Sequence, residues 1–109
     1  LHCENYNPYF FPAWPEGLFD FIFATEVVEH FRRPAADWAR MLSLLKSGGI
    51  LTVMTAPWED LQAFRTWGYA SDETHLAFYH RKTLEWIFEQ FGLAELADGN
   101  PRVCVLKKR

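Results

Sequence analysis

The sequence predicts an α/β domain in which helices pack against a mostly parallel sheet. Two apolar runs of strand length, at residues 19–24 and 50–55, each precede a segment whose apolar residues recur at helical spacing. Strands that alternate with helices in this way form parallel sheets. Two further runs, at residues 93–97 and 102–106, flank the turn-forming residues 98–101 and predict a β-hairpin. The hairpin adds one antiparallel strand to the sheet.

The helices are predicted from their apolar stripes and from the residues at their ends. Pro34 fits the first turn of the first helix, and Gly48 with Gly49 is expected to end that helix. Gly92 closes the second helix in the same way. In both helices apolar residues recur at i, i+3, i+4 and i+7. They are Trp38, Met41, Leu42 and Leu45 in the first helix, and Leu84, Ile87, Phe88 and Phe91 in the second.

Two segments fall outside this alternation. Residues 1–17 are rich in aromatic residues and contain three prolines, so a loop is predicted there. Residues 59–64 are expected to form a short helix. The aromatic side chains of the loop either line a pocket for a flat or apolar acceptor or pack beneath the loop. They are Tyr6, Tyr9, Phe10, Phe11 and Trp14.

Composition narrows the class of protein. The chain has 109 residues, of which 50% are hydrophobic and 17% aromatic, so it can bury a core. Its net charge of -3 predicts no attraction to nucleic acid or to anionic membranes. Its longest apolar runs fall short of a membrane span. The 2 cysteines lie near opposite ends of the chain, which is typical of an intracellular protein with free thiols. A cytoplasmic location is therefore expected.

Three motifs resemble those of small-molecule class I methyltransferases that use S-adenosylmethionine. The run FDFIFATEVVEHF at residues 19–31 resembles the family's fourth strand and the turn that follows it. Residues 45–51, LKSGGIL, resemble the "L-K-P-G-G" turn into strand five, with Ser47 in place of the usual proline. Residues 74–79, THLAFY, resemble the segment that precedes the family's sixth strand.

The resemblance implies part of a Rossmann-like methyltransferase sheet. Residues 1–109 would be the C-terminal portion of one methyltransferase domain, with strands four to seven in the order four, five, seven, six and only the last antiparallel. The family holds S-adenosylmethionine with a glycine-rich turn after strand one and an acidic residue at the end of strand two. Neither is found in this sequence, so the isolated chain is expected to bind the cofactor poorly and to be inactive.

The implied function is methyl transfer from S-adenosylmethionine to a small molecule, as part of a longer parent protein. The alternative is a non-catalytic remnant or interaction domain that kept the sheet and lost the cofactor. The outer edge of the strand at residues 19–24 would lack a neighbour in the isolated chain, which predicts that the chain dimerises through this edge or aggregates.

The end of that strand carries the predicted site, because ligands of open α/β sheets bind at the carboxyl ends of the strands. The resemblance places Ala24, Thr25 and Glu26 against the cofactor. Glu26, Glu29 and His30 are spaced at i, i+3 and i+4, so a helical turn would put them on one face.

Three interpretations of this face remain open. His30, with Glu26 beside it, is a catalytic base that takes a proton from the acceptor. Alternatively, Glu26, Glu29 and His30 bind a divalent metal such as magnesium or zinc. Quinone-biosynthesis and small-RNA methyltransferases use a matching Glu-x-x-Glu-His, and the latter add a distant histidine, for which His75 is a candidate. In the third interpretation all three residues are structural.

Two residues before the second helix are candidate substrate contacts. His75 and Tyr79 follow strand five, where loops carry function in folds of this kind. His80 is expected to cap the helix that follows.

Overall fold

The computed structural model describes residues 4, 6, 13–58, 75–97, 100 and 102–109. The short helix expected at residues 59–64 and most of the turn at residues 98–101 lie outside the described residues, as does most of the aromatic loop. The described elements follow the predicted order. They are β1 (Phe19–Thr25), the 3-10 turn η1 (Val28–His30), α1 (Pro34–Ser43), β2 (Leu45–Met54), α3 (Arg81–Gln90), β3 (Leu93–Ala97) and β4 (Val103–Lys108).

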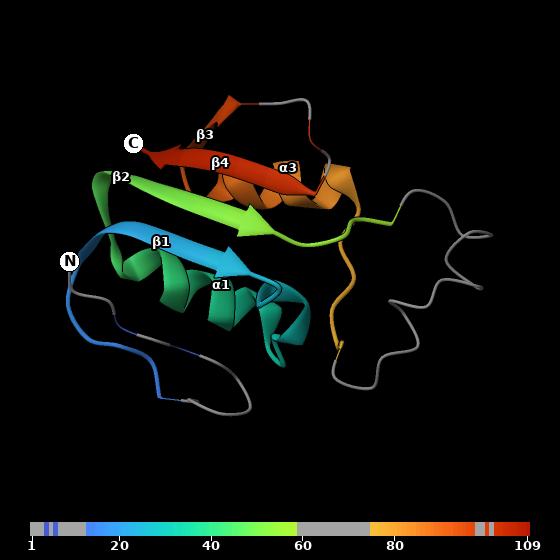
Figure 1. Ribbon diagram of the computed structural model, residues 1–109, viewed down its shortest axis with the longest axis horizontal. Helices are drawn as coiled ribbons and strands as arrows, with labels where there is room; N and C mark the ends of the chain where they lie inside the picture. Colours follow the sequence, from blue (N-terminus) through green and yellow to red (C-terminus); the bar gives the residue numbers. More distant parts are fainter. Residues whose placement is uncertain (1–3, 5, 7–12, 59–74, 98–99, 101) are drawn as a thin grey trace.

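The strands form one four-stranded sheet in the order β1-β2-β4-β3 (Figure 1). β1 and β2 are parallel, and β4 is antiparallel to both β2 and β3. In the numbering of a full methyltransferase sheet this is four, five, seven, six with a reversed last strand. The predicted α/β fold class and strand order are therefore confirmed.

Both helices cover the same face of the sheet. The rings of Trp38 in α1 and Phe88 in α3 meet with centroids 6.4 Å apart. They belong to one apolar cluster with Leu51 and Val53 of β2 and Leu106 of β4. Since side chains alternate between the two faces of a strand, these three strand residues all point toward the helices. Burial of this cluster is the main stabilising contribution to the fold. Neither described helix has the length and apolar character that crossing a bilayer requires.

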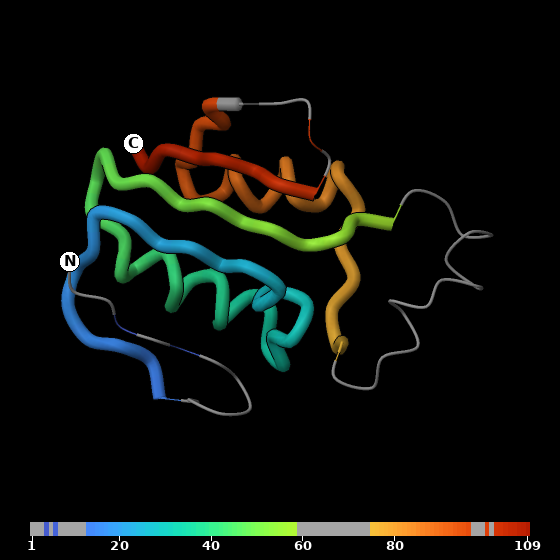
Figure 2. The backbone as a smooth tube through the Cα atoms, in the orientation of Figure 1, coloured from blue at the N-terminus to red at the C-terminus, as the bar shows by residue number. Residues whose placement is uncertain are grey.

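The opposite face of the sheet presents large apolar side chains to solvent. Phe21 and Phe23 of β1 are 61% and 73% exposed, and Leu96 of β3 is 55% exposed. Figure 2 shows β1, β2 and β4 crossing the molecule side by side, with the two helices beneath them. Phe21 and Phe23 lie two residues apart on β1 and therefore share one face, whereas Leu96 lies on β3 at the opposite edge of the sheet.

One prediction about the first helix is wrong. Gly48 and Gly49 were expected to end α1, but α1 ends at Ser43 and both glycines lie within β2. The reason is a shift of register: Phe19 pairs with Leu45, yet Phe21 pairs with Ile50, so the start of β2 bulges. Gly48 has a φ of 80°, and a Cβ at Gly49 would lie 2.6 Å from Leu45 Cδ1. The two glycines therefore allow the backbone conformation and the close packing that the bulge requires.

The end of α1 is capped by a lysine instead. The Nζ of Lys108 at the end of β4 donates hydrogen bonds of 2.8 Å to the carbonyl oxygens of Leu42 and Leu45. The last carbonyls of a helix lack partners within the helix, and a cation there also complements the helix dipole. This contact joins the last strand to the connection between α1 and β2.

Candidate functional site at the end of β1

The chain leaves β1 through a left-handed turn at Glu26. Thr25 is the last residue of β1 to pair with β2, and the backbone N–H of Glu26 still donates to the carbonyl of Met54 at 2.8 Å. Glu26 then adopts a φ of 53°, which non-glycine residues rarely do. The left-handed residue turns the chain out of the sheet plane and leads it into η1.

The predicted common face of Glu26, Glu29 and His30 is therefore wrong for Glu26. The helical turn begins only at Val28, so Glu26 precedes it. A 3-10 turn also has 3.0 residues per turn, which changes the angular spacing assumed for an α-helix. Glu29 and His30 remain neighbours in η1.

Glu29 is a buried carboxylic residue. Its relative exposure is 0%, as is that of Val28 beside it. His30 at the end of η1 is half-buried. Burial of a carboxylate is costly unless other groups compensate its charge, which marks Glu29 as a candidate for function.

The segment that begins at His75 docks against η1 through backbone hydrogen bonds. The N–H groups of Leu76 and Ala77 both donate to the carbonyl oxygen of Glu29, at 2.7 and 3.0 Å. These bonds bring His75 beside His30. The two imidazole rings meet edge to face, with centroids 4.9 Å apart and an angle of 64° between the planes.

Glu29, His30 and His75 together form a group that could hold a metal ion. One ligand atom from each residue lies within 4.8 Å of the other two. Ligands on a common zinc ion lie roughly 3–3.5 Å apart, given metal–ligand distances of about 2.0–2.2 Å. Small side-chain rotations would close that difference. Among the described residues the group includes His75 rather than Glu26 as its third member.

Tyr79 lies in the core and not at a substrate-facing surface. It is 4% exposed, and its hydroxyl donates to the carbonyl oxygen of Val28 at 2.9 Å. The Tyr79 hydroxyl oxygen in turn accepts a hydrogen bond of 3.2 Å from Trp38 Nε1. Burial raises the pKa of the Tyr79 phenol to about 12, and the nearby charge of Glu29 adds to the effect. The hydroxyl therefore stays protonated at neutral pH and remains a donor.

The residues predicted to contact the cofactor lie at the end of β1. The side chain of Ala24 is 2% exposed and packs on the helix side, so only its backbone is available for a ligand. Thr25 is exposed and Glu26 is half-buried. Their contact with S-adenosylmethionine stays a prediction.

His80 caps α3 as expected. Its Nδ1 accepts a hydrogen bond of 3.1 Å from the backbone N–H of Lys82, and its ring packs against Trp58 with centroids 4.8 Å apart. A polar cluster that no sequence motif indicated begins one residue further on, at Arg81. Arg81 donates to Glu85 in the next turn and to Glu95 in β3. Burial lowers the pKa of Arg81, but these two hydrogen bonds outweigh burial and raise it overall.

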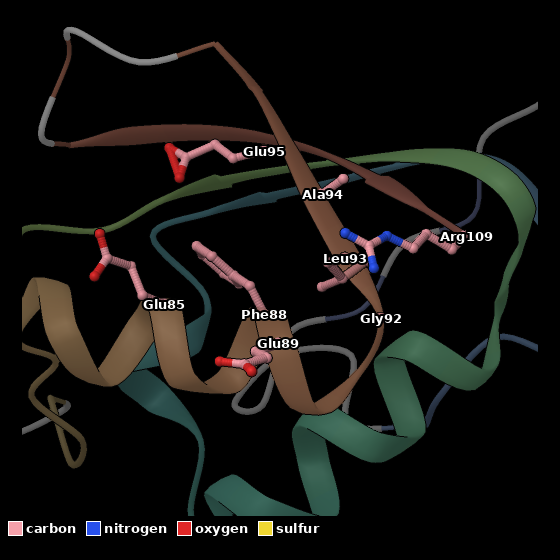
Figure 3. Close-up of a pocket in the computed structure, with 8 residues that line it drawn as sticks. All are labelled: Glu85, Phe88, Glu89, Gly92, Leu93, Ala94, Glu95 and Arg109. Carbon is pink, nitrogen blue, oxygen red and sulfur yellow. The ribbon is translucent and has the colours of Figure 1, made fainter.

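A cavity of about 460 Å³ lies elsewhere, between α3 and β3 (Figure 3). The chain end with Arg109 borders it, and β4 runs antiparallel to β2, so this cavity is remote from the carboxyl end of β1. Two of its carboxylates, Glu85 and Glu95, are already engaged by Arg81. Its lining residues are Glu85, Phe88, Glu89, Gly92, Leu93, Ala94, Glu95 and Arg109. The candidate site at the end of β1 is therefore separate from this cavity.

Comparison with known families concerns the chain as a whole. A family model described as a methyltransferase domain matches residues 3–97. Among curated proteins, no sequence matches the chain significantly. The match spans most of the chain and includes β1, η1 and the segment that carries His75. On that match and on its strand order, the chain belongs to the methyltransferase domain family, in the class I group that uses S-adenosylmethionine.

Proposed function

We propose that the protein transfers a methyl group from S-adenosylmethionine to a small-molecule acceptor at the carboxyl end of β1. The observation that carries the proposal is the methyltransferase family match over residues 3–97. The end of β1 supports the location, because a left-handed turn there leads into a buried carboxylate and two imidazoles. The alternative is a non-catalytic member of the family that serves as an interaction domain.

The main contribution of this chain to the reaction is to position the cofactor and the acceptor. S-adenosylmethionine supplies, when bound, a methyl group that is already activated by the charge on sulfur. The backbone of Ala24 and the side chains of Thr25 and Glu26 are proposed to line the cofactor. Residues near the end of β1 then have to hold the acceptor in line and exclude water, which supplies much of the rate.

His30 is the proposed general base. Histidine is the side chain that most often serves as a general base, and His30 is half-buried at the end of η1. It would accept the proton that an acceptor hydroxyl, amine or thiol loses as the methyl group is transferred. A positioned base of this kind contributes about 10²–10⁴-fold to a rate.

The arrangement of Glu29, His30 and His75 favours a second candidate, a divalent metal site. One buried carboxylate and two imidazoles fit a metal ion, because the carboxylate supplies charge and the imidazoles supply nitrogen ligands. Such a donor set suits zinc, iron or cobalt better than magnesium, which prefers oxygen ligands. A bound ion would polarise an acceptor oxygen and lower its pKa.

Calorimetric titration tests the proposal on the protein in its longest natural form. We expect S-adenosylmethionine to bind with 1:1 stoichiometry and S-adenosylhomocysteine to compete with it. Binding should survive His30→Ala, because His30 faces the acceptor. If neither ligand releases or absorbs heat and neither shifts the melting temperature, the interaction-domain alternative holds.

Chelation distinguishes a general-base role of His30 from a metal-binding role. Dialysis against a strong chelator should leave turnover intact if His30 acts as a base, and should abolish it if Glu29, His30 and His75 hold an ion. His80→Asn is the matched control, since asparagine is a good helix cap and residue 80 lies outside the group. Normal turnover by His30→Ala after chelation would overturn both roles.

A further inference from the structure

We propose that Tyr79 is a positioning residue whose buried hydroxyl holds Glu29, His30 and His75 together. The inference rests on the site proposed above and concerns what assembles it. The site joins η1 to the segment before α3, and these are far apart in sequence. The hydroxyl of Tyr79 reaches across 51 residues to the carbonyl oxygen of Val28, at 2.9 Å.

The hydroxyl is oriented from two sides. Trp38 Nε1 in α1 donates to the Tyr79 oxygen at 3.2 Å, so the phenolic proton is left to point at Val28. All three residues are buried, with Val28 0% and Trp38 1% exposed. In such surroundings water cannot replace a lost partner, so each hydrogen bond constrains geometry strongly.

The carbonyl of Val28 belongs to the peptide group that joins Val28 to Glu29. Fixing this peptide plane fixes the direction in which the Glu29 side chain leaves the backbone. At the other end of the contact, Tyr79 lies on the same segment as His75, which the Glu29 carbonyl anchors through Leu76 and Ala77. Tyr79 therefore constrains both halves of the site at once.

Among these contacts, the Tyr79 hydrogen bond comes from a side chain and can be deleted without altering the backbone. Tyr79→Phe removes one oxygen and leaves the aromatic packing against Trp38 in place. We expect η1 and the His75 segment to separate slightly, so that the three ligand atoms no longer converge. The ring contact between His30 and His75 should weaken at the same time.

Cobalt(II) is a suitable probe, because its visible absorption reports ligand number and geometry. We expect wild-type protein to bind Co²⁺ and Tyr79→Phe to bind it about tenfold more weakly with a changed visible spectrum, a difference of about 1.4 kcal/mol. Ile87→Val is the matched control. It removes one buried methylene group from α3 at a cost of about 0.5–1.5 kcal/mol, away from the site. Its Co²⁺ affinity and spectrum should equal those of wild type.

A second measurement needs no metal. Nuclear Overhauser effects between the ring protons of His30 and His75 should be present in wild type and in Ile87→Val, and weak in Tyr79→Phe. If wild type binds no Co²⁺ but Tyr79→Phe still loses these effects, the metal proposal fails and the positioning role stands. If Tyr79→Phe keeps both the Overhauser effects and the wild-type Co²⁺ behaviour, Tyr79 does not position the site.

Discussion

Removing the ammonium group of Lys108 should destabilise the fold at the junction of α1 and β2. The Nζ donates two hydrogen bonds of 2.8 Å, to Leu42 and Leu45, at a helix end that has no glycine cap. Lys108→Met keeps the apolar stem of the side chain and deletes both bonds. The carbonyl of Leu45, which is 1% exposed as a residue, would then lose a partner in a buried position.

The magnitude follows from the kind of bond that is lost. Hydrogen bonds that involve a charged group contribute about 1.5–3 kcal/mol, and a cation at a helix C-terminus adds about 0.3–1 kcal/mol. The two bonds share one ammonium group, so their contributions are not additive. Fixing that group in the folded state opposes part of the gain, by up to about 2 kcal/mol. We therefore expect Lys108→Met to lower the free energy of unfolding by about 2 kcal/mol.

Urea unfolding followed by tryptophan fluorescence measures this loss. The transition midpoint should fall while the denaturant slope stays unchanged, since the same surface is exposed on unfolding. Lys107→Met is the control, because Lys107 is the exposed neighbour on the same strand. If the two variants lose the same free energy to within about 0.5 kcal/mol, which is the scatter of surface substitutions, the cap does not stabilise the fold.

Three further predictions follow from particular contacts. Gly49→Ala should lower the free energy of unfolding by about 1–3 kcal/mol, because its Cβ would lie 2.6 Å from Leu45 Cδ1 and 2.8 Å from the carbonyl of Lys46; a variant as stable as wild type in urea would show that the bulge relaxes. Burial raises the pKa of Tyr79 from 10.0 to about 12, so the unfolded chain loses the phenolic proton at a lower pH than the folded protein does. The free energy of unfolding should therefore fall between about pH 10 and pH 12, and Tyr79→Phe should lack this pH-dependent fall. In the described part of the chain β1 pairs with β2 alone, so we propose that its outer edge pairs with a second copy; light scattering should find a dimer that Phe23→Lys weakens, and a wild-type monomer at high concentration would refute the pairing.

The fold was largely predictable because most of its helices and strands can be identified from their own residues. The order of the elements follows from apolar runs of strand length, a proline at the start of α1 and a glycine after α3. Connections between parallel strands are almost always right-handed, which limits how elements in this order can pack. The start of β2 was not predictable. Leu45 continues the helical spacing of Trp38 and Leu42, yet it lies in the sheet because pairing with Phe19 outweighs that pattern. Helical periodicity around Leu45 contains no information about its pairing with the distant Phe19 or about the bulge that follows it in β2.

The site was predictable only in part. The spacing of Glu29 and His30 at the end of a strand indicated both as site residues, and the resemblance indicated His75. Glu26 was grouped with them on the assumption of a regular helix, whereas its φ of 53° places it in a left-handed turn. Tyr79 was assigned to the substrate because its motif position does not reveal which way the ring points. The partners that decide both cases, Met54 for Glu26 and Val28 for Tyr79, are remote in sequence.

Transfer of a labelled methyl group tests the central claim most directly. Protein in its longest natural form is incubated with S-adenosylmethionine that carries tritium in the methyl group, together with catechol, phenol, amine and thiol acceptors. The account predicts that label enters at least one acceptor class, that His30→Ala slows this transfer on the order of 10²-fold, and that His80→Asn transfers as wild type does. Label that stays entirely with the cofactor for every acceptor, or equal rates for His30→Ala and wild type, would contradict the account.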